Sequence, residues 1–186
     1  SKVENMSILT EKKRFNASEQ IRNCLLLLEK KWSAKNIDLD VEFDDYDIEA
    51  DEELMKQVWI NLFDNAIKFT PDGGKISVSV AGDARFICAT ITNYGAEIPS
   101  ESLGKIFNKF YQGDTSHASR GNGIGLSIVK RIVDLHGGTV TVNSGDGKTV
   151  FAVTLPAPPE ACPLPPQGKQ PAATAKKSAK KSQRSP

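Results

Sequence analysis

The chain has 186 residues and 39% hydrophobic content, which is enough for one domain with a core and makes a second domain unexpected. No apolar run approaches the roughly 18 residues of a membrane-spanning helix, and no secretory signal is present, so a soluble piece is expected. The net charge of +1 hides two unlike parts, because residues 1–155 carry 18 Lys/Arg and 22 Asp/Glu whereas residues 156–186 carry six and one.

The cysteines show neither paired spacing nor a metal-ligand pattern, which is typical of a reducing compartment. Cys24 and Cys88 are expected to be core thiols, and Cys162 falls in the tail. The chain begins without Met in a charged segment, which indicates a piece of a longer protein.

Residues 156–186 hold eight of the ten prolines, two Lys-Lys pairs and almost no large apolar side chain. This composition cannot bury enough surface to fold, so we expect a disordered basic tail. A basic arm would suit nucleic acid or anionic lipid. A solvated tail accounts for the pattern more simply, so no specific nucleic-acid partner is expected.

In chain order, the polar residues 1–15 are predicted to be the end of a helix from an upstream region. An amphipathic helix follows over 16–33, capped by Asn16 or Ser18 and with an inward stripe of Ile21, Cys24, Leu25, Leu28 and Trp32. Alternating apolar residues then predict strands over 37–43 and 46–50.

Residues 51–70 are predicted to form the central helix. Its apolar side is expected to hold Met55, Trp59, Leu62, Ala66 and Phe69. The opposite side is expected to hold Leu54, Val58, Asn61, Asn65 and Lys68.

After a Pro-Asp-Gly-Gly turn at 71–74, two alternating strands are predicted over 75–81 and 85–93. A short helix over 99–110, a polar loop over 112–120 and a helix over 121–136 follow, the last with Ile124, Ile128, Ile132 and Leu135 inward. Final strands are predicted over 139–143 and 149–155. The fold class is therefore α+β, with a mixed, mostly antiparallel sheet covered on one face by helices.

Asn61, Asn65 and Lys68 stand out on the central helix. Short amides are mediocre helix formers, so helix stability alone does not explain them. Amide oxygens beside an ammonium group suit a hydrated Mg²⁺ ion and the phosphates that it bridges. A polar helix face without a ligand remains the alternative.

Three glycines on alternate residues, Gly121, Gly123 and Gly125, precede the last long helix. Glycines let the backbone approach a ligand closely, and the helix start offers free amides and a positive dipole end to phosphate. Leu126 stands where the dinucleotide fingerprint needs a small residue, and the separate segment Gly73-Gly74-Lys75-Ile76 lacks the spacing and the Ser/Thr of a P-loop. A tight turn with no ligand remains the alternative.

The order of these motifs resembles the catalytic ATP-binding (HATPase) domain of bacterial two-component sensor histidine kinases, within the Bergerat-fold (GHKL) group that includes gyrase, Hsp90 and MutL. The resemblance covers residues 16–155, which makes it more specific than any single motif. Residues 61–70 resemble the N box of that family, 93–99 its G1 box, 107–111 its F box and 121–125 its G2 box.

The resemblance implies a Bergerat α/β sandwich that binds ATP and Mg²⁺. Asn65 matches the magnesium ligand, and residues 112–120 would form a lid over the triphosphate. Catalytic roles at the phosphates would fall to Asn61, Lys68, Lys109 and Arg120. The implied nucleotide-binding set is Asn61, Asn65, Lys68, Asn93, Gly95, Ile98, Tyr111, Gly121, Gly123, Ile124, Gly125, Leu126 and Thr149, the last beside the adenine.

Departures from the family pattern occur at Asn93, which replaces an Asp, at Glu97, which replaces a second Gly, and at Gln112, which often is Arg. In the family that Asp accepts a hydrogen bond from the adenine amino group. An Asn carbonyl oxygen still accepts, but it is neutral and weaker. We therefore expect adenine binding that is kept but modest.

The implied function is that of a protein histidine kinase, which donates the γ-phosphate of Mg·ATP to a histidine for relay to a response regulator. In the family this histidine lies on an upstream helical hairpin and is followed by an acidic residue. Neither His117 nor His136 has that context, so the acceptor domain is expected to be missing from this chain. His136 is interpreted as a helix-end residue that interacts favourably with the helix dipole.

By the same resemblance, the domain is expected to be cytoplasmic and the parent protein to be anchored in the cell membrane. Family dimers form through the hairpin, so a homodimeric parent and a monomeric fragment are expected.

Other functions were weighed against this one. Gyrase-like ATPases activate water with a Glu, and the matching position here is Asn61, a poor base. An anti-sigma serine kinase, a nucleotide-binding scaffold with weakened catalysis and a nucleic-acid binder that uses its basic tail remain alternatives.

Overall fold

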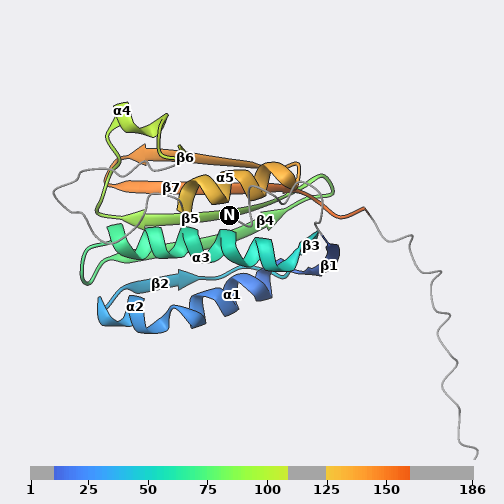
Figure 1. Ribbon diagram of the computed structural model, residues 1–186. Coiled ribbons are helices and arrows are strands. Elements are labelled where there is room, and N and C mark those ends of the chain that lie inside the picture. Colours follow the sequence, from blue (N-terminus) through green and yellow to red (C-terminus); the bar gives the residue numbers. More distant parts are fainter. Residues whose placement is uncertain (1–10, 109–124, 160–186) are drawn as a thin grey trace, which may run out of the picture.

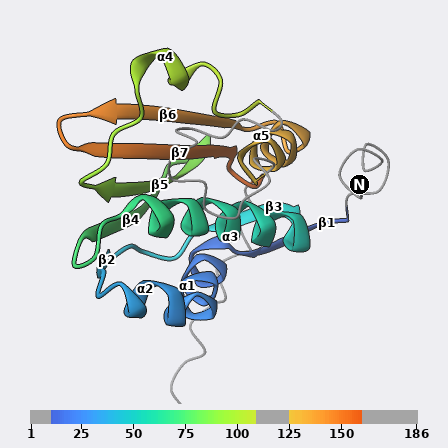
Figure 2. The same cartoon turned by 60° about the vertical axis from the view of Figure 1, so that its left-hand side comes forward.

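A computed structural model describes residues 11–108 and 125–159. A five-stranded sheet carries helices on one face, and a two-stranded ladder lies at one end (Figure 1). The helices lie side by side across that face in a second view as well (Figure 2). None of the helices in these ranges is long and apolar enough to cross a membrane.

The strands are β1 (Lys12–Asn16), β2 (Asp38–Val41), β3 (Asp47–Asp51), β4 (Lys75–Gly82), β5 (Phe86–Tyr94), β6 (Thr139–Gly145) and β7 (Lys148–Pro156). The helices are α1 (Ala17–Leu27), α2 (Glu29–Ala34), α3 (Glu52–Phe69), α4 (Ser100–Leu103) and α5 (Gly125–Leu135). The predicted 99–110 helix is therefore much shorter, since α4 ends at Leu103.

The large sheet has the strand order β2-β4-β5-β7-β6. Strand β2 runs parallel to β4, and every other neighbouring pair is antiparallel. The prediction of a mixed, mostly antiparallel sheet with helices on one face is confirmed. Strand β7 lies between β5 and β6, so it joins the two hairpins into one sheet.

Strand β1 corrects the prediction of a helix end for residues 12–15, whereas residues 1–10 lie outside the described residues. It pairs antiparallel with β3, with Phe15 opposite Ile48. Arg14 Nε lies 3.1 Å from Asp47 Oδ2, and Lys13 forms an ion pair with Glu52. Only one of the five β1 side chains is apolar, so the strand has no alternating pattern that could reveal it.

The predicted 16–33 helix is divided at Leu28 into α1 and α2. Asn16 caps α1 as predicted, since its side chain accepts a 2.8 Å hydrogen bond from the backbone N–H of Glu19. The Trp32 indole N–H donates to the Leu25 carbonyl across the break, at 2.9 Å. The same carbonyl also accepts from the Leu28 backbone N–H at 3.1 Å, so the indole adds a second bond at the end of α1.

Helix α3 is confirmed as the central helix. Asp51 caps it by accepting a hydrogen bond from the Leu54 N–H at 3.1 Å. Glu52 and Glu53 occupy its first turn, where their carboxylates interact favourably with the positive end of the helix dipole. At the other end Lys35 Nζ donates to the Ile67 carbonyl at 2.7 Å. Both ends are thus fixed by side chains.

The two predicted faces of α3 need a correction. The structure buries Leu54 and Val58, which were predicted to share the polar side, and it leaves Phe69 46% exposed. Packing between α1, α5 and the sheet encloses α3 on more than one side, so its apolar surface is wider than a single stripe.

The inward stripe of α5 also differs from the prediction. The structure buries Val129, Ile132 and Val133, whereas Ile128 and Leu135 are half-buried. Nearly every second residue of α5 is apolar, so the sequence permits more than one stripe, and contact with α3 selects among them.

Cys24 and Cys88 differ in environment, because Cys24 is buried in the core and Cys88 is only half-buried. Burial raises the pKa of the Cys24 thiol to about 11. We therefore expect iodoacetamide at pH 8 to alkylate Cys88 and to leave Cys24 unmodified under native conditions, because the thiolate is the reactive form. Mass spectrometry of the peptides would measure this, and equal labelling of both would contradict it.

Candidate functional site

The polar residues of α3 are placed as expected for a ligand-binding face. Asn61 and Asn65 are half-buried, and Lys68 is exposed in the last turn. The Asn61 Nδ2 donates to the Gln57 carbonyl at 2.8 Å, which fixes the orientation of its amide. The Asn65 amide has no hydrogen-bond partner among the described residues.

The start of α5 lies against this face. A Cβ atom placed on Gly125 would come within 3.0 Å of Asn61 Oδ1. A side chain at that position would press on an amide that Gln57 already holds. The glycine therefore allows the close approach of two segments that were singled out separately in the sequence.

Asn93 and Thr149 are brought together by the sheet. They are directly opposite each other on β5 and β7, and both are buried, with 2% and 3% exposure. Strand β5 also buries Ala89 and Ile91, the residues that alternate with its half-buried positions. Both polar residues thus occupy the inner face of the sheet, beneath the helices.

The loop after β5 is tied to the β6–β7 hairpin. Gly95 has a φ of 101° and donates its N–H to the Gly147 carbonyl at 2.7 Å, while the Gly147 N–H donates to Glu97 Oε1 at 2.5 Å. The Ile98 N–H donates to Ser144 Oγ at 2.7 Å. Glu97, which departs from the family pattern, therefore fastens this loop instead of obstructing it.

Ser144 and the turn glycine Gly147 were not predicted from the sequence as parts of this region. Ser144 Oγ lies 2.9 Å from the Thr149 hydroxyl, which in turn donates to the Ala96 carbonyl at 3.0 Å. Polar residues at a hairpin turn are common, so no local signal distinguished them.

His136 lies between the end of α5 and the start of α3. Its Nε2 accepts from the Asp51 backbone N–H at 3.0 Å, and its Nδ1 lies 2.7 Å from the Ile132 carbonyl. A carbonyl only accepts, so Nδ1 is the donor in this hydrogen bond. His136 directly follows the last residue of α5, as the helix-end interpretation expected, and its ring also links that helix to the start of α3.

Several predicted site residues lie outside the described residues: Lys109, Tyr111, Arg120, Gly121, Gly123 and Ile124, together with Gln112 and His117. Leu126 is described and is half-buried in the first turn of α5. The structure thus brings together the N-box face with Gly125, and Asn93 with Thr149.

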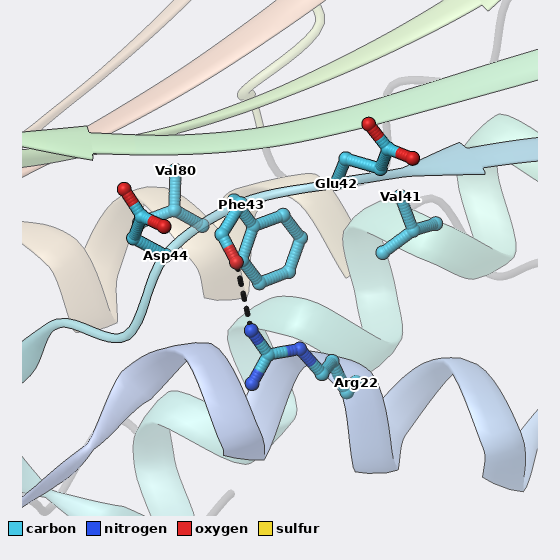
Figure 3. A pocket seen from close by; sticks show the side chains of 6 residues that line it. All are labelled: Arg22, Val41, Glu42, Phe43, Asp44 and Val80. Atoms are coloured by element: carbon cyan, nitrogen blue, oxygen red, sulfur yellow. Dashed lines mark hydrogen bonds between the residues drawn. The ribbon is translucent and has the colours of Figure 1, made fainter.

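A hollow of about 580 Å³ lies elsewhere, between α1 and the segment that follows β2 (Figure 3). Arg22 occupies one side of it, with its guanidinium 4.8 Å from the centre of the Phe43 ring. The same group donates to the Phe43 carbonyl and to Asp45, both at 2.8 Å. Arg22 is thus used to hold this segment against α1, and no other Lys or Arg is among the described residues that line the hollow.

Residues 50–159 match the model of the family described as "Histidine kinase-, DNA gyrase B-, and HSP90-like ATPase". The chain belongs to this family. The matched range contains α3, the Asn93–Thr149 pair and α5.

Among curated relatives, the sensor histidine kinase CusS of Escherichia coli K12 is 31% identical over 159 residues, which cover 84% of this chain and 33% of CusS. The adaptive-response sensory kinase SasA of Prochlorococcus marinus MIT 9303 is 36% identical over 137 residues, covering 71% of this chain and 37% of SasA. The chain thus spans about a third of the length of these relatives.

Solved structures agree with the family. The catalytic domain of histidine kinase ThkA superposes with a TM-score of 0.72 at 37% identity, covering 79% of this chain and 96% of that domain. Another ThkA structure, in complex with response regulator protein TrrA, gives a TM-score of 0.70 at 36% identity and covers 81% of this chain and 43% of that one. The Bergerat-type fold of the catalytic domain is therefore confirmed.

Proposed function

We propose that the chain is the ATP-binding catalytic part of a sensor histidine kinase, which binds Mg·ATP and donates the γ-phosphate to a histidine on an upstream domain. The observation that carries the proposal is the contact between Gly125 and Asn61. It puts the start of α5, which offers backbone amides to phosphate, beside the amide face of α3.

The residues present fit a magnesium ion. No group of three His, Cys, Asp or Glu side chains in 11–108 and 125–159 forms an all-protein metal cage. Mg²⁺ keeps several waters and commonly binds one or two protein oxygens together with phosphates. Asn65, whose amide is unpaired within the described part, would supply that oxygen. When bound, Mg²⁺ neutralises phosphate charge.

The remaining roles belong to this chain's own residues. Lys68 places a positive charge beside the phosphates. Asn61 orients the phosphates through its side-chain amide, which the hydrogen bond to the Gln57 carbonyl holds in place. Asn93 and Thr149 hold the adenine from the inner face of the sheet. Lys109 and Arg120, outside the described residues, complete the positive charge at the γ-phosphate. Catalysis is then mainly a matter of position and charge.

The proposed partners follow from the same assignment. The acceptor histidine would lie upstream of β1, in a domain that also makes the parent a homodimer, and phosphate would pass on to a response regulator. The ThkA complex with its response regulator TrrA supports such a partner. CusS is named a sensor histidine kinase and SasA an adaptive-response sensory kinase, which supports a role in signalling. The family resemblance further suggests a cytoplasmic catalytic domain whose parent is anchored in the membrane.

An ATPase that activates water is disfavoured at the same site. A general base has to accept a proton, and the Asn61 amide does so poorly. An anti-sigma serine kinase would be recognised by transfer of phosphate to a protein serine, and a scaffold by nucleotide binding without any transfer.

Calorimetric titration with a non-hydrolysable ATP analogue tests the proposal. We expect binding that strengthens when Mg²⁺ is added, because the metal joins Asn65 to the phosphates. The same titration in EDTA serves as control. Absence of binding at millimolar analogue would contradict the proposed function.

A further inference from the structure

Asn93 carries a nearly buried amide that has no hydrogen-bond partner among the described residues. The residue is only 2% exposed, and neither atom of its amide has a hydrogen-bond partner in the described part of the chain. No fully enclosed side-chain polar atom in that part lacks a partner, so both amide atoms must keep a small accessible surface. Buried amides are normally paired, which indicates that an external group completes this one.

The hydroxyl of the neighbouring Thr149 already has hydrogen-bond partners, unlike the Asn93 amide. Its single hydroxyl hydrogen is donated to the Ala96 carbonyl at 3.0 Å, and its oxygen lies 2.9 Å from Ser144 Oγ. Toward a ligand, Thr149 therefore only accepts. Any donor on this pair of residues has to come from the Asn93 amide.

A carboxamide offers a donor and an acceptor side by side. The edge of a 6-aminopurine presents an amino donor and the N1 acceptor, and a 6-oxopurine presents the reverse, a carbonyl acceptor and the N1 hydrogen. No described neighbour fixes which way the Asn93 amide points, so rotation by half a turn matches either edge. A carboxylate only accepts, and it would repel a 6-carbonyl.

Building on the proposed nucleotide-binding function, we infer that the site takes 6-oxopurine nucleotides of the inosine type as well as adenine nucleotides. Asn93 is the specificity-determining residue. The chemical reason is that its neutral amide replaces the fixed acceptor that would otherwise select for an amino group at position 6.

ITP is the probe, because it differs from ATP only at the 6-position and in the hydrogen on N1. Mg·ATP and Mg·ITP would be titrated calorimetrically into the whole chain, the Asn93→Asp variant and the Asn143→Asp variant. Asn143 is exposed on β6, so its variant controls for the added charge. We expect the two dissociation constants to differ by less than about tenfold in the unaltered chain and in Asn143→Asp. In Asn93→Asp, discrimination against ITP should rise by a further tenfold or more, on the order expected for a mismatched buried hydrogen bond.

Two results would overturn the inference while leaving the proposed function intact. One is a dissociation constant for ITP that exceeds that for ATP by more than about a hundredfold in the unaltered chain. The other is a ratio of the ITP and ATP dissociation constants that is the same in Asn93→Asp as in the unaltered chain. In both cases ATP would still bind. Loss of both nucleotides in the unaltered chain would remove the proposed function as well. Should Asn93→Asp fail to fold, Asn93→Ala is expected to weaken ATP and ITP by the same factor, and an effect on ATP alone would contradict the inference.

Discussion

Replacing Asn65 with Ala is expected to weaken magnesium-dependent nucleotide binding by at least about tenfold, since even the loss of an outer-shell partner costs a metal site that much. The Asn65 amide is half-buried and has no hydrogen-bond partner in the described part of the chain. Its removal therefore breaks no described internal contact, and Ala is the better helix former. Calorimetry with a non-hydrolysable ATP analogue, in Mg²⁺ and in EDTA, would measure the effect.

The matched control for this variant is Asn23→Ala. Asn23 is exposed within α1, so the same chemical change occurs on a helix away from the proposed site. Without Mg²⁺, the unaltered chain and Asn65→Ala should bind the analogue with the same weak affinity. If Asn65→Ala kept the full response to Mg²⁺, the metal assignment would be wrong, and another oxygen would have to hold the ion.

The predictions from sequence succeeded where the signal is local. Helix α3 has a capping Asp51, acidic residues in its first turn and a long apolar period, so its bounds are correct within a residue. The strands β4 to β7 also alternate clearly. The prediction for β1 failed, because this strand is held by pairing with β3 and by charged side chains and has no apolar pattern of its own.

The candidate site is formed mostly by residues that are far apart in the sequence, so the periodicity of single helices and strands does not predict it. Gly125 meets Asn61 only because α5 packs on α3, and Asn93 meets Thr149 only because β7 enters the sheet beside β5. Asn61 and Gly125 were singled out by their own sequence patterns, whereas Asn93 and Thr149 were singled out only by the family resemblance. Ser144, Glu97 and His136 take part through hydrogen bonds between distant segments, so their roles became visible only in three dimensions.

Trp59 is the largest fully buried side chain among the described residues, with 1% exposure, and it anchors α3. Its indole N–H donates to Gln20 Oε1 at 2.9 Å, and the Gln20 amide donates to the Glu52 carbonyl at 2.8 Å. This chain of contacts fastens α1 to the start of α3. The bulk of Trp59 fills the core between them.

We therefore expect Trp59→Ala to lower the free energy of unfolding by about 3–5 kcal/mol, because it leaves a large cavity. Urea denaturation followed by circular dichroism would measure the loss. Trp59→Phe, which keeps a ring but strands the Gln20 oxygen, should lose about 1–2 kcal/mol and remains measurable if the Ala variant does not fold.

The second tryptophan is the control, since Trp32 is half-buried on α2 and should lose less stability when changed to Ala. Equal urea midpoints of unfolding for Trp32→Ala and Trp59→Ala would contradict a dominant role for the α1–α3 contact. A loss of about 3–5 kcal/mol is a large share of the stability of a domain of this size. Because Asn61, Asn65 and Lys68 all lie on α3, nucleotide binding by Trp59→Ala should fall together with its folded fraction.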